Sequence, residues 1–174
     1  MVGASWIVDK DNLQEAISLQ ALLFPSEADA GRRNLIDSVE GRLPGHYWLY
    51  DVDDLGIVGM RGIYSVPGDD ESAWLGWFGV KPEFRRQGYA SQMLFLFELE
   101  AERMDYEYVR LYTEHDNTRA KALYEKYGYT CEPYECEEDD YPHKIDIYSK
   151  SLNGTPCPPW GNKNLHLGEE LSKK

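Results

Sequence analysis

Apolar residues recur at three- and four-residue intervals in four stretches of the chain, which is the spacing of amphipathic helices. This pattern predicts helices over Asn12–Leu23, from Ser26 as N-cap to Val39, over Arg86–Met104 and over Asn117–Tyr127. Pro25, Pro44 and Gly128 follow the first, second and fourth of these stretches and favour their termination.

The remaining apolar runs are short, rich in aromatic residues and bounded by turn residues, as strands are. We expect strands over Tyr47–Val52, Gly56–Val66, Ala73–Val80, Tyr108–Thr113, Tyr129–Cys131 and Lys144–Lys150. Asp53 and Asp54 predict a tight hairpin turn, and Pro67–Asp70 predicts the next turn. Two helices precede these strands and a third connects two of them as a crossover. This order predicts an α/β fold with a mixed sheet.

A chain of 174 residues has the usual size of one domain. We expect a single domain over residues 1–151 and a C-terminal tail over residues 152–174, because the tail contains Pro156, Pro158 and Pro159 and has no periodic pattern. This extended tail either packs on the domain through Trp160 or is flexible. It also has the composition of a segment that completes a homodimer or docks on a partner.

The charge balance is strongly acidic, with 18 basic and 31 acidic residues and a formal net charge of -13. This balance disfavours nucleic acid or an anionic membrane as the main partner and suits a cationic acceptor, although solubility alone also explains it. No apolar run approaches the length of a membrane span. The first residues lack the basic flank and apolar run of a signal peptide, so we expect a cytoplasmic protein.

The cysteines indicate neither a disulfide framework nor a metal site. An odd set of three, Cys131, Cys136 and Cys157, cannot pair completely within the chain and favours reduced thiols. They lack a CxxC spacing and a histidine pair at ligand distance, so no metal is expected.

The junction between a predicted strand and a predicted helix, residues 80–91, has the features of an anion site. A helix N-terminus exposes unpaired amides, and Gly88 allows a phosphate to approach the main chain. Arg85 and Arg86 add positive potential, although an ordinary connection with solvated arginines is the alternative. The junction has neither GxGxxG nor GxxxxGK, which argues against a dinucleotide or nucleoside triphosphate.

Two motifs together resemble the GNAT (Gcn5-related N-acetyltransferase) superfamily. Residues 85–90, RRQGYA, match its (Q/R)xxGx(G/A) signature, and residues 117–129, NTRAKALYEKYGY, match its NxxAxxLYxxxG(F/Y) signature. The resemblance is good over residues 74–134. It implies a mixed, mostly antiparallel central sheet with helices on both faces, acetyl-CoA as co-substrate and an amine as acceptor.

The resemblance also implies roles for particular residues. The backbone of the strand before the first motif would pair with the pantetheine arm, the amides of the motif would hold the pyrophosphate, and Asn117 would bond the pantetheine or cap its helix. The cofactor-binding residues so implied are Phe78, Gly79, Val80, Arg85, Arg86, Gln87, Gly88, Tyr89, Ala90, Ser91 and Asn117. Tyr124 would protonate the departing thiolate, the alternative being an aromatic residue of the core.

The acceptor side is less defined by the sequence. Some family members use a strand-end carboxylate as base at the position of Tyr112. Strand alternation makes Glu114 the candidate here, the alternative being a solvated carboxylate at the strand end, whereas His115 would point the other way. The acidic segment Glu132–Asp140 either attracts a cationic acceptor or is a solvated loop. Aromatic residues that either line an acceptor pocket or pack in the core are Trp74, Trp77, Tyr134 and Tyr141.

The motifs favour an N-acetyltransferase in which a primary amine attacks acetyl-CoA directly within a ternary complex. Acceptors consistent with this reading include a polyamine, an aminoglycoside-like amine, an amino acid, or a protein N-terminus or lysine. The alternatives are a CoA-binding sensor without turnover and an interaction module that docks through its tail. The intact Tyr124 and Asn117 argue against the sensor.

Overall fold

The computed structural model describes residues 3–134 and 145–160 of the chain. The helical elements are α1 (Leu13–Leu23), the 3-10 turn η1 (Pro25–Glu27), α2 (Ala28–Val39), the 3-10 turn η2 (Pro82–Phe84), α3 (Tyr89–Arg103) and α4 (Thr118–Lys126). The strands are β1 (Ala4–Ile7), β2 (Gly45–Val52), β3 (Gly56–Val66), β4 (Asp69–Val80), β5 (Tyr108–Glu114), β6 (Thr130–Tyr134) and β7 (Ile145–Ser151). None of the described helices is long and apolar enough to cross a membrane.

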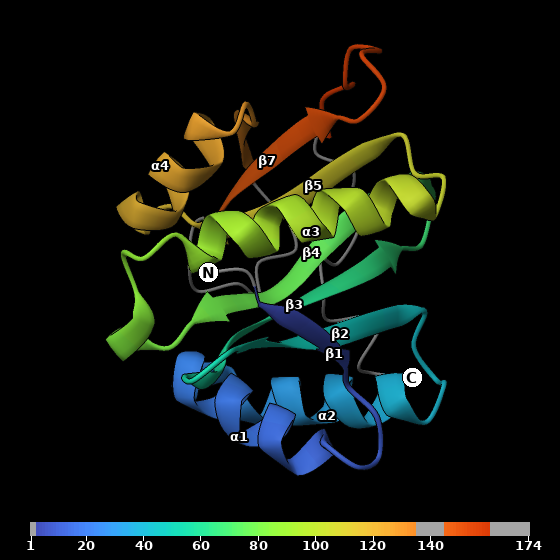
Figure 1. Cartoon of the computed structure of the whole chain (residues 1–174). Helices are drawn as coiled ribbons and strands as arrows, with labels where there is room; N and C mark the ends of the chain where they lie inside the picture. Colours follow the sequence, from blue (N-terminus) through green and yellow to red (C-terminus); the bar gives the residue numbers. More distant parts are fainter. Residues whose placement is uncertain (1–2, 135–144, 161–174) are drawn as a thin grey trace.

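The seven strands form one sheet in the order β1-β2-β3-β4-β5-β7-β6. Every neighbouring pair is antiparallel except β4 and β5, which are parallel because α3 connects them as a crossover (Figure 1). The predicted mixed, mostly antiparallel sheet with helices on both faces is therefore confirmed.

Neighbouring residues on the strands alternate between two cores, one on each face of the sheet. On β4, Leu75 packs in the cluster that contains Leu94 and Phe97 of α3, whereas Trp74 packs on the opposite side. Helices α1 and α2 cover that opposite side over β2 and β3, where Leu35 and Met60 share a third cluster. Two helical layers thus enclose the sheet.

The structure corrects several predicted boundaries. A strand, β1, precedes the first helix and pairs with β2, although all four of its residues are exposed and so give no buried alternation to detect. Strand β4 begins at Asp69, because Gly68 at φ 88° allows a two-residue turn in which Val66 pairs with Asp69. Ser26 lies within η1 and does not cap α2, whose N-cap is Glu27.

The start of the long helix also differs from the prediction. It begins at Tyr89 rather than near Arg86, because Gly88 adopts a left-handed conformation at its N-cap. The turn η2 occupies part of the preceding loop. This shift places the helix N-terminus directly after the glycine of the first motif.

Residues 153–160, which we name the C-terminal strap, pack on the domain. The indole of Trp160 is completely buried and lies edge-on to Trp74, with ring centroids 4.9 Å apart. The first of the two alternatives for Trp160 is therefore confirmed, because the strap covers part of the sheet face opposite α3.

Candidate active site

Strands β4 and β5 pair at one end and then separate. Their parallel ladder contains only three pairs, the last of which joins Trp74 to Arg110. Beyond this pair the backbone of β4 that faces β5 has no ladder partner. The two strands therefore form a fork, open toward the N-terminus of α3.

A β-bulge bends β4 inside this fork. Met60 pairs with Gly79 and Gly62 pairs with Gly76, so β4 has one residue more than β3 between these pairs. Trp77 lies in the bulge with a positive φ of 40°, which is rare for a bulky residue. The bulge turns this stretch of β4 toward the space between the strands.

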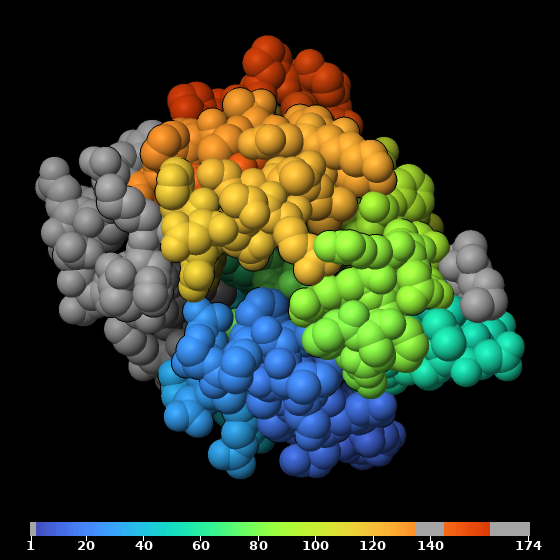
Figure 2. All heavy atoms as spheres, turned by 90° about the vertical axis from the view of Figure 1, so that its left-hand side faces the viewer, coloured from blue at the N-terminus to red at the C-terminus, as the bar shows by residue number. Residues whose placement is uncertain are grey.

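A cavity of about 620 Å³ occupies the fork. Its walls come from β4 and β5, the N-termini of α3 and α4, and the segment around η1. Figure 2 shows the hollow between the N-terminal helices, in blue, and the segment around α4, in yellow and orange. A space of this size is typical of a small-molecule site.

The first motif lines one end of the cavity at the N-terminus of α3. Gly88 has φ 86°, and a Cβ added there would meet no atom of the described part of the chain within 4 Å. The guanidinium of Arg85 is fixed by a 3.0 Å hydrogen bond from its Nε to the carbonyl of Val80. The helix lacks a side-chain N-cap bond, so its first amides remain available to an anion.

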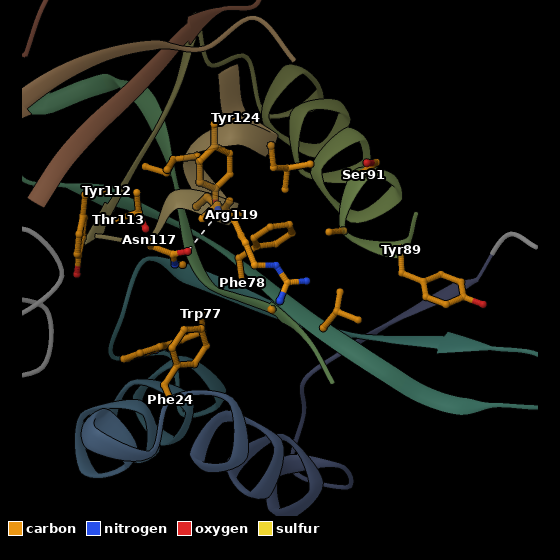
Figure 3. A pocket seen from close by; sticks show the side chains of 18 of the residues that line it. Phe24, Trp77, Phe78, Tyr89, Ser91, Tyr112, Thr113, Asn117, Arg119 and Tyr124 are labelled. Atoms are coloured by element: carbon orange, nitrogen blue, oxygen red, sulfur yellow. Dashed lines mark hydrogen bonds between the residues drawn. The ribbon is translucent and has the colours of Figure 1, made fainter. Parts of the chain in front are cut away.

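Most of the predicted cofactor residues line this cavity. The lining contains Phe78, Gly79, Val80, Arg85, Arg86, Gly88, Tyr89, Ala90, Ser91 and Asn117. Gln87 does not line it. The phenol ring of Tyr89 points away from the cavity (Figure 3), so this residue contributes at its backbone. Arg119, which the sequence analysis did not select, brings a third guanidinium group to the lining besides Arg85 and Arg86.

Tyr124 reaches the cavity from α4 (Figure 3). Its ring is 5 % exposed and lies 6.4 Å from Phe78, 5.9 Å from Tyr129 and 5.5 Å from Tyr148 between centroids. Burial raises the pKa of the Tyr124 phenol above its ordinary value of 10.0. An aromatic cluster thus packs around a phenol that stays protonated at neutral pH.

Asn117 caps α4 and lines the cavity. Its Oδ1 accepts a 3.2 Å hydrogen bond from the amide of Ala120, which is drawn as a dashed line in Figure 3. The capping role is therefore observed. The bond fixes the first turn of the helix that carries Tyr124.

Replacing Asn117 with alanine removes this cap and leaves an amide at the N-terminus of α4 unpaired. We expect the free energy of unfolding to fall by about 1 kcal/mol and Tm to fall by about 2–4 °C. Thermal unfolding followed by circular dichroism measures this change. Asn117→Asp is the matched control, because aspartate caps as well as asparagine; a loss of stability equal to that of the alanine variant would contradict the capping role.

The opposite wall of the cavity comes from the N-terminal helices and the bulge. Phe24 and Trp77 pack against each other with ring centroids 5.2 Å apart (Figure 3). The indole Nε1 of Trp77 donates a 3.1 Å hydrogen bond to Oδ1 of the buried Asn34. Glu27 is the one carboxylate among the described lining residues. This wall is aromatic and polar, whereas the guanidinium groups come from the loop before α3 and from α4.

Of the aromatic residues predicted as candidates for an acceptor pocket, Trp77 lines the cavity. Tyr112, which was not one of those candidates, lines it as well. Trp74 is buried beneath Trp160, and Tyr134 is not part of the lining. Phe24, Glu27 and Asn34 were not selected from the sequence, because only the folded chain brings α1 and α2 beside the bulge. Tyr141 and the acidic residues 135–140 lie outside the described residues.

The structure does not bring Glu114 to the cavity. Its side chain is exposed at the end of β5, and it is absent from the lining, which includes Tyr112 and Thr113. Nδ1 of His115 lies 2.9 Å from Oδ2 of Asp146. The same carboxylate oxygen forms an ion pair with Nζ of Lys121, also at 2.9 Å. This buried carboxylate ties α4 to the sheet outside the cavity. Across residues 3–134 and 145–160, no three His, Cys, Asp or Glu side chains group as metal ligands.

The fork, the bulge and the glycine turn all lie within a stretch of the chain that matches a family model. The model of the acetyltransferase (GNAT) family matches residues 13–129. The chain belongs to this family. The match spans both motifs, the bulge and the helices of the aromatic wall, and it ends before the strap. No curated protein is similar enough to match this sequence.

Solved structures of GNAT acetyltransferases share the fold of this family member. An acetyltransferase from Elizabethkingia anophelis with acetyl-CoA bound is 23 % identical, with a TM-score of 0.61 over 77 % of this chain and 88 % of that one. An enzyme from Salmonella typhimurium that modifies the N-terminal serine of a ribosomal protein is 15 % identical, with a TM-score of 0.68 over 87 % and 95 %. The spermidine/spermine N-acetyltransferase of Vibrio cholerae is 13 % identical, with a TM-score of 0.67 over 86 % and 95 %.

Proposed function

We propose that this GNAT protein transfers an acetyl group from acetyl-CoA to a primary amine within a ternary complex, with Tyr124 as the general acid. The observation that carries the proposal is the buried phenol of Tyr124, which lines the same cavity as the fork and the glycine turn. The similarity to enzymes that act on spermidine and on a protein N-terminus supports an amine acceptor.

The lining residues suit acetyl-CoA. The amides of α3 and the guanidinium groups of Arg85, Arg86 and Arg119 provide positive potential for its pyrophosphate. The backbone of Phe78, Gly79 and Val80 lies in the fork, where an extended pantetheine arm would add like a strand. One of these amides would polarise the thioester carbonyl.

The chemical step balances with these groups. The neutral amine nitrogen attacks the thioester carbon, the carbon–sulfur bond breaks, and the electron pair leaves on sulfur. The Tyr124 phenol hydrogen-bonds the sulfur and donates a proton as negative charge develops there. The attacking nitrogen releases its own proton to water in the cavity or to a carboxylate.

Glu27 is the carboxylate that we propose for this proton, in place of Glu114. Both side chains are exposed, but Glu27 belongs to the lining of the cavity and Glu114 does not. We expect Glu27→Gln to lower kcat/KM for the amine by about tenfold at neutral pH. The matched variant Glu114→Gln should stay within about twofold of wild type. The opposite ranking of the two losses in kcat/KM would restore Glu114 as the base.

The decisive experiment for the function combines binding and turnover. Acetyl-CoA is titrated into the protein by calorimetry, and the complex is then offered polyamines, aminoglycosides, amino acids and peptides while release of free thiol is followed. Binding with release for one amine class supports the enzyme and identifies its acceptor. Binding without release over the whole panel favours the CoA-binding sensor. Absence of binding would overturn the acetyl-CoA site.

The free thiols and the net charge bear on the cellular context. The described Cys131 and Cys157 are free, which fits the reducing, cytoplasmic compartment that we propose for the reaction. The acidic composition fits a cationic acceptor, which the amine panel tests directly.

A further inference from the structure

Arg110 occupies the closed end of the fork, at the last pair between β4 and β5. Its side chain is 2 % exposed and makes three hydrogen bonds, each to a different segment. These run from Nε to Oγ of Ser72 at 3.1 Å, from Nη1 to Oγ of Ser149 at 2.7 Å, and from Nη2 to the carbonyl of Pro158 at 2.8 Å. One buried guanidinium therefore joins β4, β7 and the C-terminal strap.

Trp160 completes this junction from the strap. Its ring lies 5.6 Å from the Arg110 guanidinium and edge-on to Trp74. Its backbone amide donates a hydrogen bond to Glu132 of β6. A fully buried indole held by β4, β5 and β6 is a fixed part of the fold, because its removal would leave a large void.

The cluster around Trp160 continues into the wall of the cavity. Trp74 stacks on Tyr64, with ring centroids 6.3 Å apart and planes at 27°. Tyr112 packs partly buried against the same cluster. Tyr64 and Tyr112 both line the cavity. The strap thus supports two aromatic residues of the lining from the side of the sheet opposite α3.

We propose that Trp160 is a positioning residue for the amine acceptor, acting through Trp74, Tyr64 and Tyr112. This inference rests on the proposed acetyltransferase function. The acceptor packs against these two tyrosines, whereas the pyrophosphate binds at the N-terminus of α3. Loss of the Trp160 ring therefore weakens binding of the acceptor and leaves binding of acetyl-CoA almost unchanged.

The test compares full-length Trp160→Ala and Trp160→Phe with wild type, using the amine that releases most thiol in the panel. We expect the alanine variant to raise KM for the amine by about tenfold while the calorimetric Kd for acetyl-CoA stays within about twofold. Phenylalanine keeps an aromatic ring in the cluster and should limit the rise in KM to about threefold. Thr155→Ala, an exposed position on the same strap, is the control and should leave both constants unchanged.

The outcomes separate the two proposals. Equal losses for amine and acetyl-CoA, or an unchanged KM for the amine in folded Trp160→Ala, would show that Trp160 has only a structural role. If the alanine variant lacks a cooperative thermal transition, the test rests on the phenylalanine variant. In that variant the change in KM for the amine is compared with the change in Kd for acetyl-CoA. A wild-type protein that binds acetyl-CoA but acetylates no amine would overturn the proposed function, and this inference with it.

Discussion

Replacing Tyr124 with phenylalanine lowers kcat by about 100-fold and leaves the affinity for acetyl-CoA within about twofold of wild type. The change removes one oxygen atom and preserves the ring that packs against Phe78 and Tyr148. Only the departing thiolate needs the phenolic proton, so the loss falls on the chemical step. Thiol release at saturating amine measures kcat, and calorimetry measures the affinity.

Tyr129→Phe is the matched control for this substitution. Tyr129 is as buried as Tyr124 and packs 5.9 Å from it, but it does not line the cavity. Removing its hydroxyl should change kcat by less than about twofold. Similar losses in the two variants would show that the aromatic cluster, rather than a proton from Tyr124, supports the rate.

The pH profile provides a second check on Tyr124. Because burial raises the pKa of its phenol above 10.0, the group stays protonated throughout the neutral and mildly basic range. The rate should therefore rise with pH as the amine loses its proton, and should not fall again below about pH 9. A decline near neutral pH would identify a different acid.

The sequence predicted more of the cavity wall around the two motifs than of the wall opposite them. Asn117 begins a short contiguous motif whose residue types favour an N-cap, and this cap is present in the structure. Gly88 was placed inside the helix predicted over Arg86–Met104, whereas it adopts a left-handed conformation and the helix begins at the next residue, Tyr89. Local chemistry therefore sufficed for the cap but not for the start of α3.

The wall opposite the motifs depends on contacts between distant segments. Phe24 contacts Trp77 only because α1 packs against the bulge of β4. No local sequence pattern predicts a contact between these two residues. Glu114 was selected by strand alternation, but the lining of the cavity ends at Thr113 on that strand. Alternation along a strand predicts the face of the sheet on which a side chain lies, but not whether that side chain is close enough to the cavity to line it.

The proline-containing tail illustrates the same limit. Its apolar residues follow no periodic pattern, which is typical of an extended segment, yet Trp160 is completely buried. The partner that holds the strap is Arg110, which donates to the carbonyl of Pro158 across 48 positions in the chain. A hydrogen bond between residues so far apart in the chain leaves no local sequence pattern. The sequence therefore indicated packing of the tail only as one of two alternatives.

Replacing Gly88 with valine weakens acetyl-CoA binding by about 100-fold while the chain still unfolds cooperatively. Gly88 has φ 86°, a conformation that a β-branched residue adopts only with strain. Among residues 3–134 and 145–160, no atom lies within 4 Å of the added Cβ, so the substitution does not disrupt the core. The strain instead turns the first amides of α3 away from the anion, and the branched side chain occupies space at the turn. Calorimetry measures the loss.

Gly41→Val separates this local effect from strain in general. Gly41 follows α2 with φ 74°, has the same open surroundings and does not line the cavity. Its valine variant should lose comparable stability and keep full affinity for acetyl-CoA. Normal affinity in folded Gly88→Val would place the pyrophosphate elsewhere, and equal losses at both glycines would attribute the effect to the fold as a whole. A loss confined to Gly88 would show that the α3 N-terminus binds the cofactor, independently of any effect of Tyr124 on the rate.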